Sequence, residues 1–211
     1  SRIVAIGPTE EVEVPEVAEL VDGSNKYLMP GLAEMHGHIP PLNQPIEFIE
    51  AVLFMYVANG VTTVRGMLGA DGQLDLRDRS SRGELIAPNL YLAGPSFRDS
   101  SINSPEEAIG KVRAQKAEGW DLLKIHPGLT IDEYDAMAKT ADEEGMRFGG
   151  HVPADVGLAH AIEMGQETFD HLDGYLEYVE GDMGTIDEQQ LAYIIQKTRD
   201  AGAWVVPTMA L

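Results

Sequence analysis

The sequence contains no cysteine and is poor in positive charge. Without cysteine there are no disulfides, thiolate metal ligands or cysteine nucleophiles, so a metal or catalytic site has to use histidine, carboxylates or lysine. Lysine and arginine together number 15 against 35 acidic residues, and the net charge of -20 repels nucleic-acid backbones and anionic membranes. We therefore expect neither nucleic acid nor a membrane as a partner.

Long hydrophobic runs are also missing. No apolar stretch approaches the roughly 20 residues that span a bilayer, and the chain does not open with the basic and apolar pattern of a signal peptide. The compartment is left open: the cytoplasm is favoured, and export after removal of a signal peptide is the alternative. With 211 residues, 44% of them hydrophobic, the chain can form one large core, or a domain plus a fragment of a second.

From residue 31 onward the chain repeats one unit, in which an amphipathic helix is followed by a glycine and a short β-rich run. Such alternation predicts parallel βαβ units. Seven strands predict a (β/α)8 TIM-type barrel with seven of its eight strands present, and an open doubly wound sheet is less favoured because no glycine-rich phosphate loop follows the first strand. The predicted strands include residues 36–38, 61–65, 89–93, 121–125, 146–151, 168–171 and 203–207, and the predicted helices include residues 46–59, 105–119, 131–145, 155–164 and 187–201.

Residues 1–30 differ from the repeated part. Residues 2–7 are predicted as a β-branched strand, and valine alternates with glutamate over residues 11–14. This segment is too short to bury a sheet face by itself. We predict that residues 1–30 belong to a sheet whose other strands are missing from this chain and that residues 31–211 form the barrel.

Two histidines, His36 and His38, stand one residue apart at the end of the first predicted strand. Residues i and i+2 of a strand point to the same side, so both imidazoles could chelate one ion. Gly37 between them lets another element pack closely on the opposite face. Taken alone, the pattern fits an ordinary strand with two polar residues equally well.

Further histidines and a lysine occupy the ends of other predicted strands. Pro40, Pro127 and Pro153 follow His38, Lys124 and His151, and proline cannot continue a central strand. His171 stands before a Leu-Asp-Gly turn. These side chains are therefore predicted at the carboxyl ends of strands, which form the catalytic face of a barrel.

Lys124 can be interpreted in two ways. Flanked by leucine and isoleucine, its amine would lose water, and a neutral amine can add carbon dioxide to form a carbamate that bridges two divalent ions. The alternative is a lysine paired with an acidic neighbour, which we would prefer if the histidines were absent.

Four other residues are candidates for contact with a substrate. His126 shares the inward face with Lys124, with a packing role as the alternative, and Arg65 ends the second strand, where pairing with an acidic residue is favoured. Tyr175 and Tyr178 are predicted in a loop that overhangs the site, with simple packing as the alternative. Asp170 is predicted to point away from the face of His171 and to be structural.

Several of these motifs resemble the amidohydrolase superfamily. Residues 30–38 (PGLAEMHGH) resemble its opening motif, and residues 60–65 (GVTTVR) resemble its second strand. The similarity continues through residues 123–125 (LKI), 150–152 (GHV) and 168–171 (TFDH), and is strongest to the prolidase-like and imidazolonepropionase-like branch.

The resemblance implies a (β/α)8 barrel beside a small β-sandwich, of which residues 1–30 would be a part. It also implies a metal-dependent hydrolase that cleaves a carbon–nitrogen bond of a small molecule, such as an amide, a cyclic amide or a dipeptide-like bond, with a hydroxide that bridges the metals. It implies two divalent ions, with zinc as the default for an imidazole-rich site. His36 and His38 would bind one ion, His151 and His171 the other, and a carboxylated Lys124 would bridge them.

One element of the family pattern has no match in the sequence. The catalytic aspartate that follows the eighth strand in this family is expected beyond Leu211, so the chain is interpreted as a fragment. A barrel that lacks a strand has unpaired edges, and we therefore expect self-association into a homo-oligomer. Two alternatives stay open: a metal-binding but catalytically incompetent fragment, and a mononuclear deaminase-type hydrolase with an unmodified Lys124.

Overall fold

The computed structural model describes residues 3–181 and 184–208, and the chain divides into two units, Ser1–Pro30 and Gly31–Leu211. The first unit has no strand or helix in its described residues 3–30, and most of its side chains are exposed. The strands predicted there are not formed within residues 3–30, because alternating Val and Glu residues without a partner strand leave the backbone hydrogen-bonding groups to water; Arg2, the first residue of one predicted strand, lies outside the described residues. The assignment of residues 1–30 to a β-sandwich stays a prediction.

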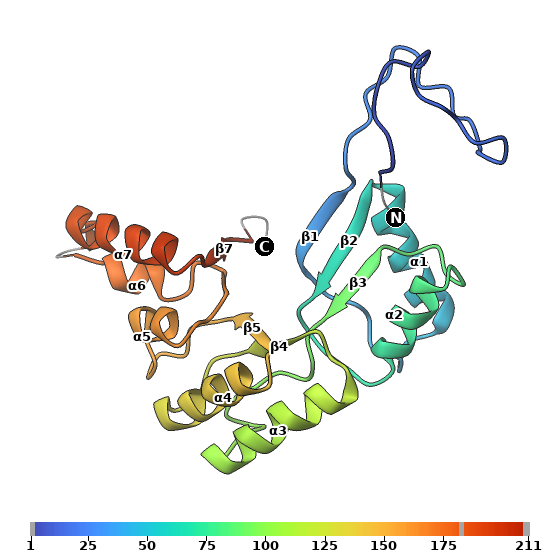
Figure 1. Cartoon of the computed structure of the whole chain (residues 1–211). Helices are drawn as coiled ribbons and strands as arrows, with labels where there is room; N and C mark the ends of the chain where they lie inside the picture. The colour runs from blue at the N-terminus through green and yellow to red at the C-terminus, as the bar shows by residue number, and fades with distance from the viewer. Residues whose placement is uncertain (1–2, 182–183, 209–211) are drawn as a thin grey trace. The chain divides into compact units, whose positions relative to one another are not determined.

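The second unit alternates strands and helices, as predicted. Its strands are β1 (Leu32–Gly37), β2 (Val61–Gly66), β3 (Asn89–Leu92), β4 (Leu122–Ile125), β5 (Arg147–Gly150), β6 (Thr168–Asp170) and β7 (Trp204–Val206). Its helices are α1 (Ile46–Ala58), α2 (Gln73–Ser81), α3 (Pro105–Glu118), α4 (Ile131–Glu143), α5 (Leu158–Glu163), α6 (Tyr175–Val179) and α7 (Glu188–Asp200). Figure 1 shows this succession along the chain.

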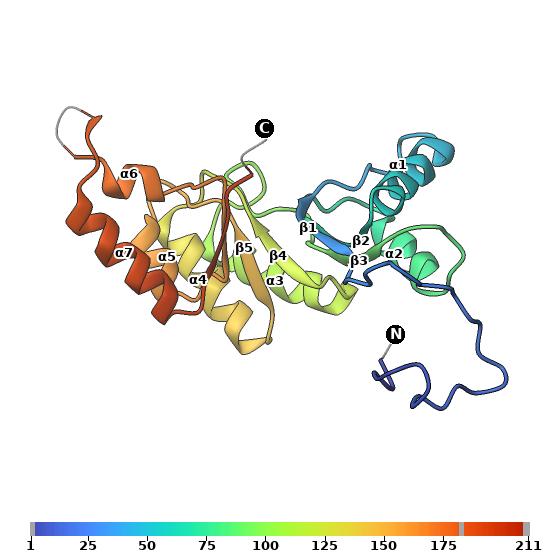
Figure 2. The same ribbon diagram turned by 90° about the horizontal axis from the view of Figure 1, so that it is seen from above.

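All pairings between the named strands are parallel, in the orders β1-β2-β3 and β4-β5-β6-β7. Two parallel bridges, Ala93 with Leu122 and Phe97 with Ile125, join the segment after β3 to β4. The strands therefore follow one another in chain order, as in a (β/α) barrel. Figure 2 shows α3, α4 and α5 near β4 and β5.

Apolar residues from strands and helices form the core of the second unit. One cluster lies between β4–β6 and the helices α3, α4, α5 and α7, with Phe97, Leu123, Tyr134 and Phe169 among its fully buried members. A second cluster lies between β2, β3 and the helices α1 and α2, with Ile49 and Leu53 among its members. No helix in the described part of the chain is long and apolar enough to cross a membrane.

The helix signals in the sequence are confirmed at two N-termini. Ser104 accepts a hydrogen bond from the Glu107 amide at the start of α3, and Thr130 forms a full capping box with Glu133 at the start of α4. Between residues 155 and 164 only α5 (Leu158–Glu163) is helical, so the helix is shorter than predicted. Residues 175–179, predicted as a loop, form α6.

The capping box of α4 leads to a stability prediction. Thr130→Ala removes the hydroxyl that accepts from the Glu133 amide at 3.4 Å, so we expect the free energy of unfolding to fall by about 1 kcal/mol. Thr130→Ser keeps the hydroxyl and should retain most of the stability. Urea unfolding followed by circular dichroism measures both variants, and equal midpoints for the alanine variant and the parent chain would contradict the role of the cap.

Candidate metal centre

The carboxyl ends of β1, β4, β5 and β6 bring five histidines together. His36 lies within β1, His38 follows that strand, and His126, His151 and His171 directly follow β4, β5 and β6. The imidazole rings form a continuous series of contacts in the order His38, His36, His171, His151 and His126, with centroid distances of 5.4, 4.5, 4.7 and 4.9 Å. Residues that are far apart in the sequence thus meet at one end of the strands.

Two glycines allow this close approach. A Cβ atom at Gly37 would lie 2.5 Å from Val64 Cγ1 of β2, which agrees with the close packing expected opposite His36 and His38. Gly150 has φ +131°, and a Cβ atom there would lie 2.4 Å from the carbonyl oxygen of Ile125. This packing holds the end of β5 against β4, where the His151 amide donates to the same Ile125 carbonyl at 3.0 Å.

Lys124 is almost fully buried, with 1% of its surface exposed, and its amine contacts an acidic neighbour. Its Nζ donates to Asp170 Oδ2 at 2.9 Å. Burial lowers the pKa of Lys124, and the carboxylate of Asp170 opposes that shift. Lys124 is therefore buried beside an acidic partner, and its carboxylation stays a prediction.

Asp170 lies at the centre of the site, contrary to the prediction. It is fully buried, and its Oδ2 atom lies 2.9 Å from Lys124 Nζ and 2.9 Å from His36 Nδ1, although the contact with His36 lacks hydrogen-bond geometry. Burial would raise the pKa of Asp170, but His36 and Lys124 hold it at about 2. Strand alternation failed as a guide because His171 has φ +62° and leaves the extended conformation directly after Asp170.

The histidines of the site are held by partners that the sequence analysis missed. His151 Nδ1 contacts Asp173 Oδ2 at 2.5 Å, and His171 Nδ1 contacts Thr208 Oγ1 at 2.6 Å. Such partners fix the ring orientation of histidines that bind metals. Asp173 could have been found from the sequence, because it lies in the turn two residues after His171. Nothing in the local sequence connects Thr208 to the site.

The remaining candidates have different surroundings. Arg65 is 8% exposed and donates to Met35 O at 2.7 Å and to Thr168 Oγ1 at 3.0 Å, so its guanidinium is engaged inside the protein. Tyr175 donates to or accepts from Thr198 Oγ1 at 2.8 Å and packs edge-on against Phe169. Tyr178 packs against the same core cluster. The structure brings only His126 of these four into contact with the histidine series.

The donor set fits a divalent metal by its chemistry. Burial lowers the pKa of His38, His151 and His171 and thereby favours the neutral imidazole that metals bind. The Nδ1 atoms of His36 and His126 are buried without a hydrogen-bond partner among the described residues. Within residues 3–181 and 184–208, however, no three His, Asp or Glu side chains converge tightly enough to enclose one ion, so the rings form a row and not a closed ligand shell.

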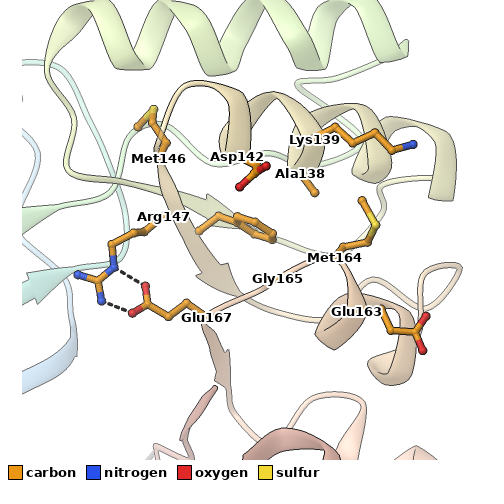
Figure 3. A pocket seen from close by; sticks show the side chains of 10 residues that line it. Ala138, Lys139, Asp142, Met146, Arg147, Glu163, Met164, Gly165 and Glu167 are labelled. Atoms are coloured by element: carbon orange, nitrogen blue, oxygen red, sulfur yellow. Dashed lines mark hydrogen bonds and ion pairs between the residues drawn. The ribbon is translucent and has the colours of Figure 1, made fainter. Parts of the chain in front are cut away.

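A pocket elsewhere in the barrel provides a contrast. It has a volume of ≈ 590 Å³ and is lined by residues of α4, β5 and α5 and of the segment before β6. Figure 3 shows Arg147 and Glu167 joined by an ion pair at its edge. Both residues lie at the amino ends of β5 and β6, opposite to the histidines, and the pocket contains none of the candidate ligands.

Parallel strands in chain order, four of which carry histidines at their carboxyl ends, are the arrangement of a (β/α) barrel with a candidate site on its catalytic face. No family model matches the chain. Adenine deaminase 3 of Rhizobium meliloti (strain 1021) is 25% identical over 191 residues, which are 81% of this chain and 31% of that protein. The adenine deaminase of Paracoccus denitrificans (strain Pd 1222) is 24% identical over 191 residues, which are again 81% of this chain and 31% of that protein.

Solved structures share the fold at low sequence identity. A Xaa-Pro dipeptidase with bound methionine matches with a TM-score of 0.62 and 24% identity, over 85% of this chain and 53% of that one. An amidohydrolase matches with a TM-score of 0.71 and 20% identity, over 95% and 58%. A prolidase complexed with N-methylphosphonate-L-proline matches with a TM-score of 0.70 and 20% identity, over 93% and 57%.

These matches confirm the barrel fold and the resemblance to the amidohydrolase superfamily that the sequence motifs indicated. The chain spans about a third of the length of the adenine deaminases and little more than half of the solved chains. This agrees with the interpretation of the sequence as a fragment.

The ionisable groups of the site lead to a prediction about pH. Burial, with Lys124 as the next cause, lowers the pKa of His126 from 6.5 to about 4, so the unfolded chain binds this proton more readily than the folded one. Stability contributed by a neutral His126 is complete above pH 6.5 and is lost as the pH falls towards about 4. Asp170, whose pKa falls from 3.8 to about 2, acts in the same direction at lower pH.

We therefore expect the free energy of unfolding of the metal-free chain to decrease from pH 7 to pH 4, measured by urea denaturation across that range. His126→Gln cannot take up the proton and should flatten part of this dependence. His160→Gln, a change outside the histidine series, is the matched control. If the free energy of unfolding changes with pH equally in the parent chain and in His126→Gln, His126 does not contribute to the pH dependence.

Proposed function

We propose that this chain is part of a metal-dependent hydrolase that cleaves carbon–nitrogen bonds of small molecules, such as amides, cyclic amides or dipeptide-like bonds. The observation that carries the proposal is the row of contacting histidines from four strand ends beside the buried Lys124. Relatives named as adenine deaminases and structural neighbours named as a prolidase and a dipeptidase support this reaction class.

In this proposal His36, His38, His151 and His171 would hold two divalent ions, with zinc favoured by the imidazole-rich donor set, and Lys124, as a carbamate, would be a further ligand. Bound divalent ions supply an activated water near neutral pH and polarise the carbonyl that is attacked. Asp173 and Thr208 orient the rings of His151 and His171. His126 is the proposed substrate contact, because its ring stacks on His151 and its Nδ1 atom has no partner in the described structure.

A deaminase-type hydrolase with one ion and an unmodified Lys124 is the second candidate. Two observations favour it: the Lys124 amine is paired with Asp170, and the curated relatives are adenine deaminases. The two candidates differ in metal stoichiometry and in the mass of the peptide that contains Lys124.

Metal analysis of the chain purified with zinc and bicarbonate tests the proposal. We expect close to two ions per chain for the bridged pair and close to one for the deaminase-type site. His151→Ala should reduce the zinc content because it removes a proposed ligand, whereas His160→Ala, a histidine of α5 outside the series, should leave it unchanged. A stoichiometry near zero in the folded parent chain would reject both candidates.

Substrate screening addresses the reaction class independently. The chain extended to the full length of its relatives is the suitable enzyme, with N-acyl amino acids, dipeptides and lactams as one panel and adenine as the other. Release of an amino acid from the first panel supports the amidohydrolase proposal, and ammonia from adenine supports the deaminase. Hydrolysis that persists unchanged in a His36→Ala, His151→Ala double variant would show that the histidine row is not the catalytic centre.

A further inference from the structure

The carboxylate of Asp170 has three partners, which come from three other strands. Its Oδ2 atom faces two proposed metal ligands, with Lys124 Nζ of β4 and His36 Nδ1 of β1 each at 2.9 Å. Its Oδ1 atom lies 3.5 Å from a terminal nitrogen of Arg65, which belongs to β2. The orientation of one buried carboxylate therefore affects where the Lys124 amine and the His36 ring lie.

Arg65 is bonded on both sides of the barrel interior. Its Nε donates to Met35 O of β1 at 2.7 Å, and one terminal nitrogen donates to Thr168 Oγ1 of β6 at 3.0 Å. Strands β1 and β6 are not neighbours in either sheet, so the guanidinium spans the interior between them. A planar guanidinium held by two hydrogen bonds has little freedom left, and the direction of its remaining nitrogen is fixed.

That remaining nitrogen approaches Asp170. By occupying the Oδ1 side of the carboxylate, it leaves Oδ2 to Lys124 and His36. If Arg65 served only to join β1 and β6, its hydrogen bonds to Met35 O and Thr168 Oγ1 would be sufficient. A second cation would not be needed next to the Asp170 carboxylate, which is already paired with Lys124. The arrangement gives Arg65 a place in the site although it touches none of the proposed ligands directly.

We propose that Arg65 is a positioning residue, which fixes the carboxylate of Asp170 so that Oδ2 holds Lys124 and His36 in register with each other. The inference rests on the proposed function in its form with an unmodified Lys124, because a carboxylated lysine would be an anion that the Asp170 carboxylate repels. Loss of a partner that orients metal ligands typically reduces metal affinity 10- to 100-fold. We expect an effect of this size when Arg65 is removed, although the ligands themselves remain.

The experiment compares Arg65→Met, Arg65→Lys and Arg77→Met in the 211-residue chain. Arg77 is the matched control, because it also donates to a backbone carbonyl and a carboxylate, Gly119 O at 2.9 Å and Asp121 Oδ2 at 3.1 Å, but next to the amino end of β4. Competition with a chromophoric chelator measures the Kd for Zn²⁺ alone. Nitrogen-15 NMR of the histidine rings in the metal-free chain reports the surroundings of His36.

We expect Arg65→Met to weaken Zn²⁺ binding about 10- to 100-fold and to shift the His36 ring resonances, and Arg77→Met to do neither. Arg65→Lys keeps the charge but offers a single nitrogen, so it should recover only part of the affinity. It also serves as the second variant if Arg65→Met does not fold.

The inference is overturned if folded Arg65→Met or folded Arg65→Lys leaves both the His36 resonances and the Zn²⁺ affinity as they are in the parent chain. It is also overturned if Arg77→Met has an equal effect on both, which would mark a general loss of stability. If the parent chain binds no Zn²⁺, the proposed function fails, but the His36 resonances of the metal-free variants still decide the role of Arg65.

Discussion

Burial of the Asp170 carboxylate is the constraint on which the arrangement of the barrel interior depends. Removing an ion from water costs several kcal/mol, and the cost is offset only when oppositely charged partners with good geometry surround it. Asp170 finds such partners in Lys124 and Arg65, with His36 beside them. Because these residues come from different strands, the carboxylate ties β1, β2 and β4 to β6 and restricts how the strand ends can shift.

Close backbone packing makes this ion cluster compatible with the histidines around it. Gly150 brings the end of β5 against Ile125 of β4, directly beside Lys124, and the next residue is His151. A side chain at residue 150 would push the strands apart and move His151 away from His171, whose ring centroid lies 4.7 Å from it. Packing in the strands thus determines the spacing of the donors.

Patterns within one strand or helix could be read from the sequence, and pairings across the barrel could not. Proline after His38, Lys124 and His151 correctly predicted that these residues stand at strand ends, since a missing amide donor is a local property. The place of Asp170 was predicted wrongly, because alternation assumes an extended backbone and His171 is left-handed. The partners of Arg65 lie 30 residues away at Met35 and 103 residues away at Thr168, separations over which local pattern carries no information.

The two ends of the strands differ in their surroundings, and the presence of a pocket at the amino ends does not by itself identify the functional site. At the amino ends, the pocket beside β5 has an ion pair in which Arg147 is 73% exposed, and ion pairs in water contribute only about 0–1 kcal/mol. At the carboxyl ends, His36, Arg65 and the buried Lys124 surround the carboxylate of Asp170, which water cannot reach. Buried charged groups reduce the stability of the fold, and ionisable groups in such surroundings cluster at functional sites, which is why we propose that the site lies at that end.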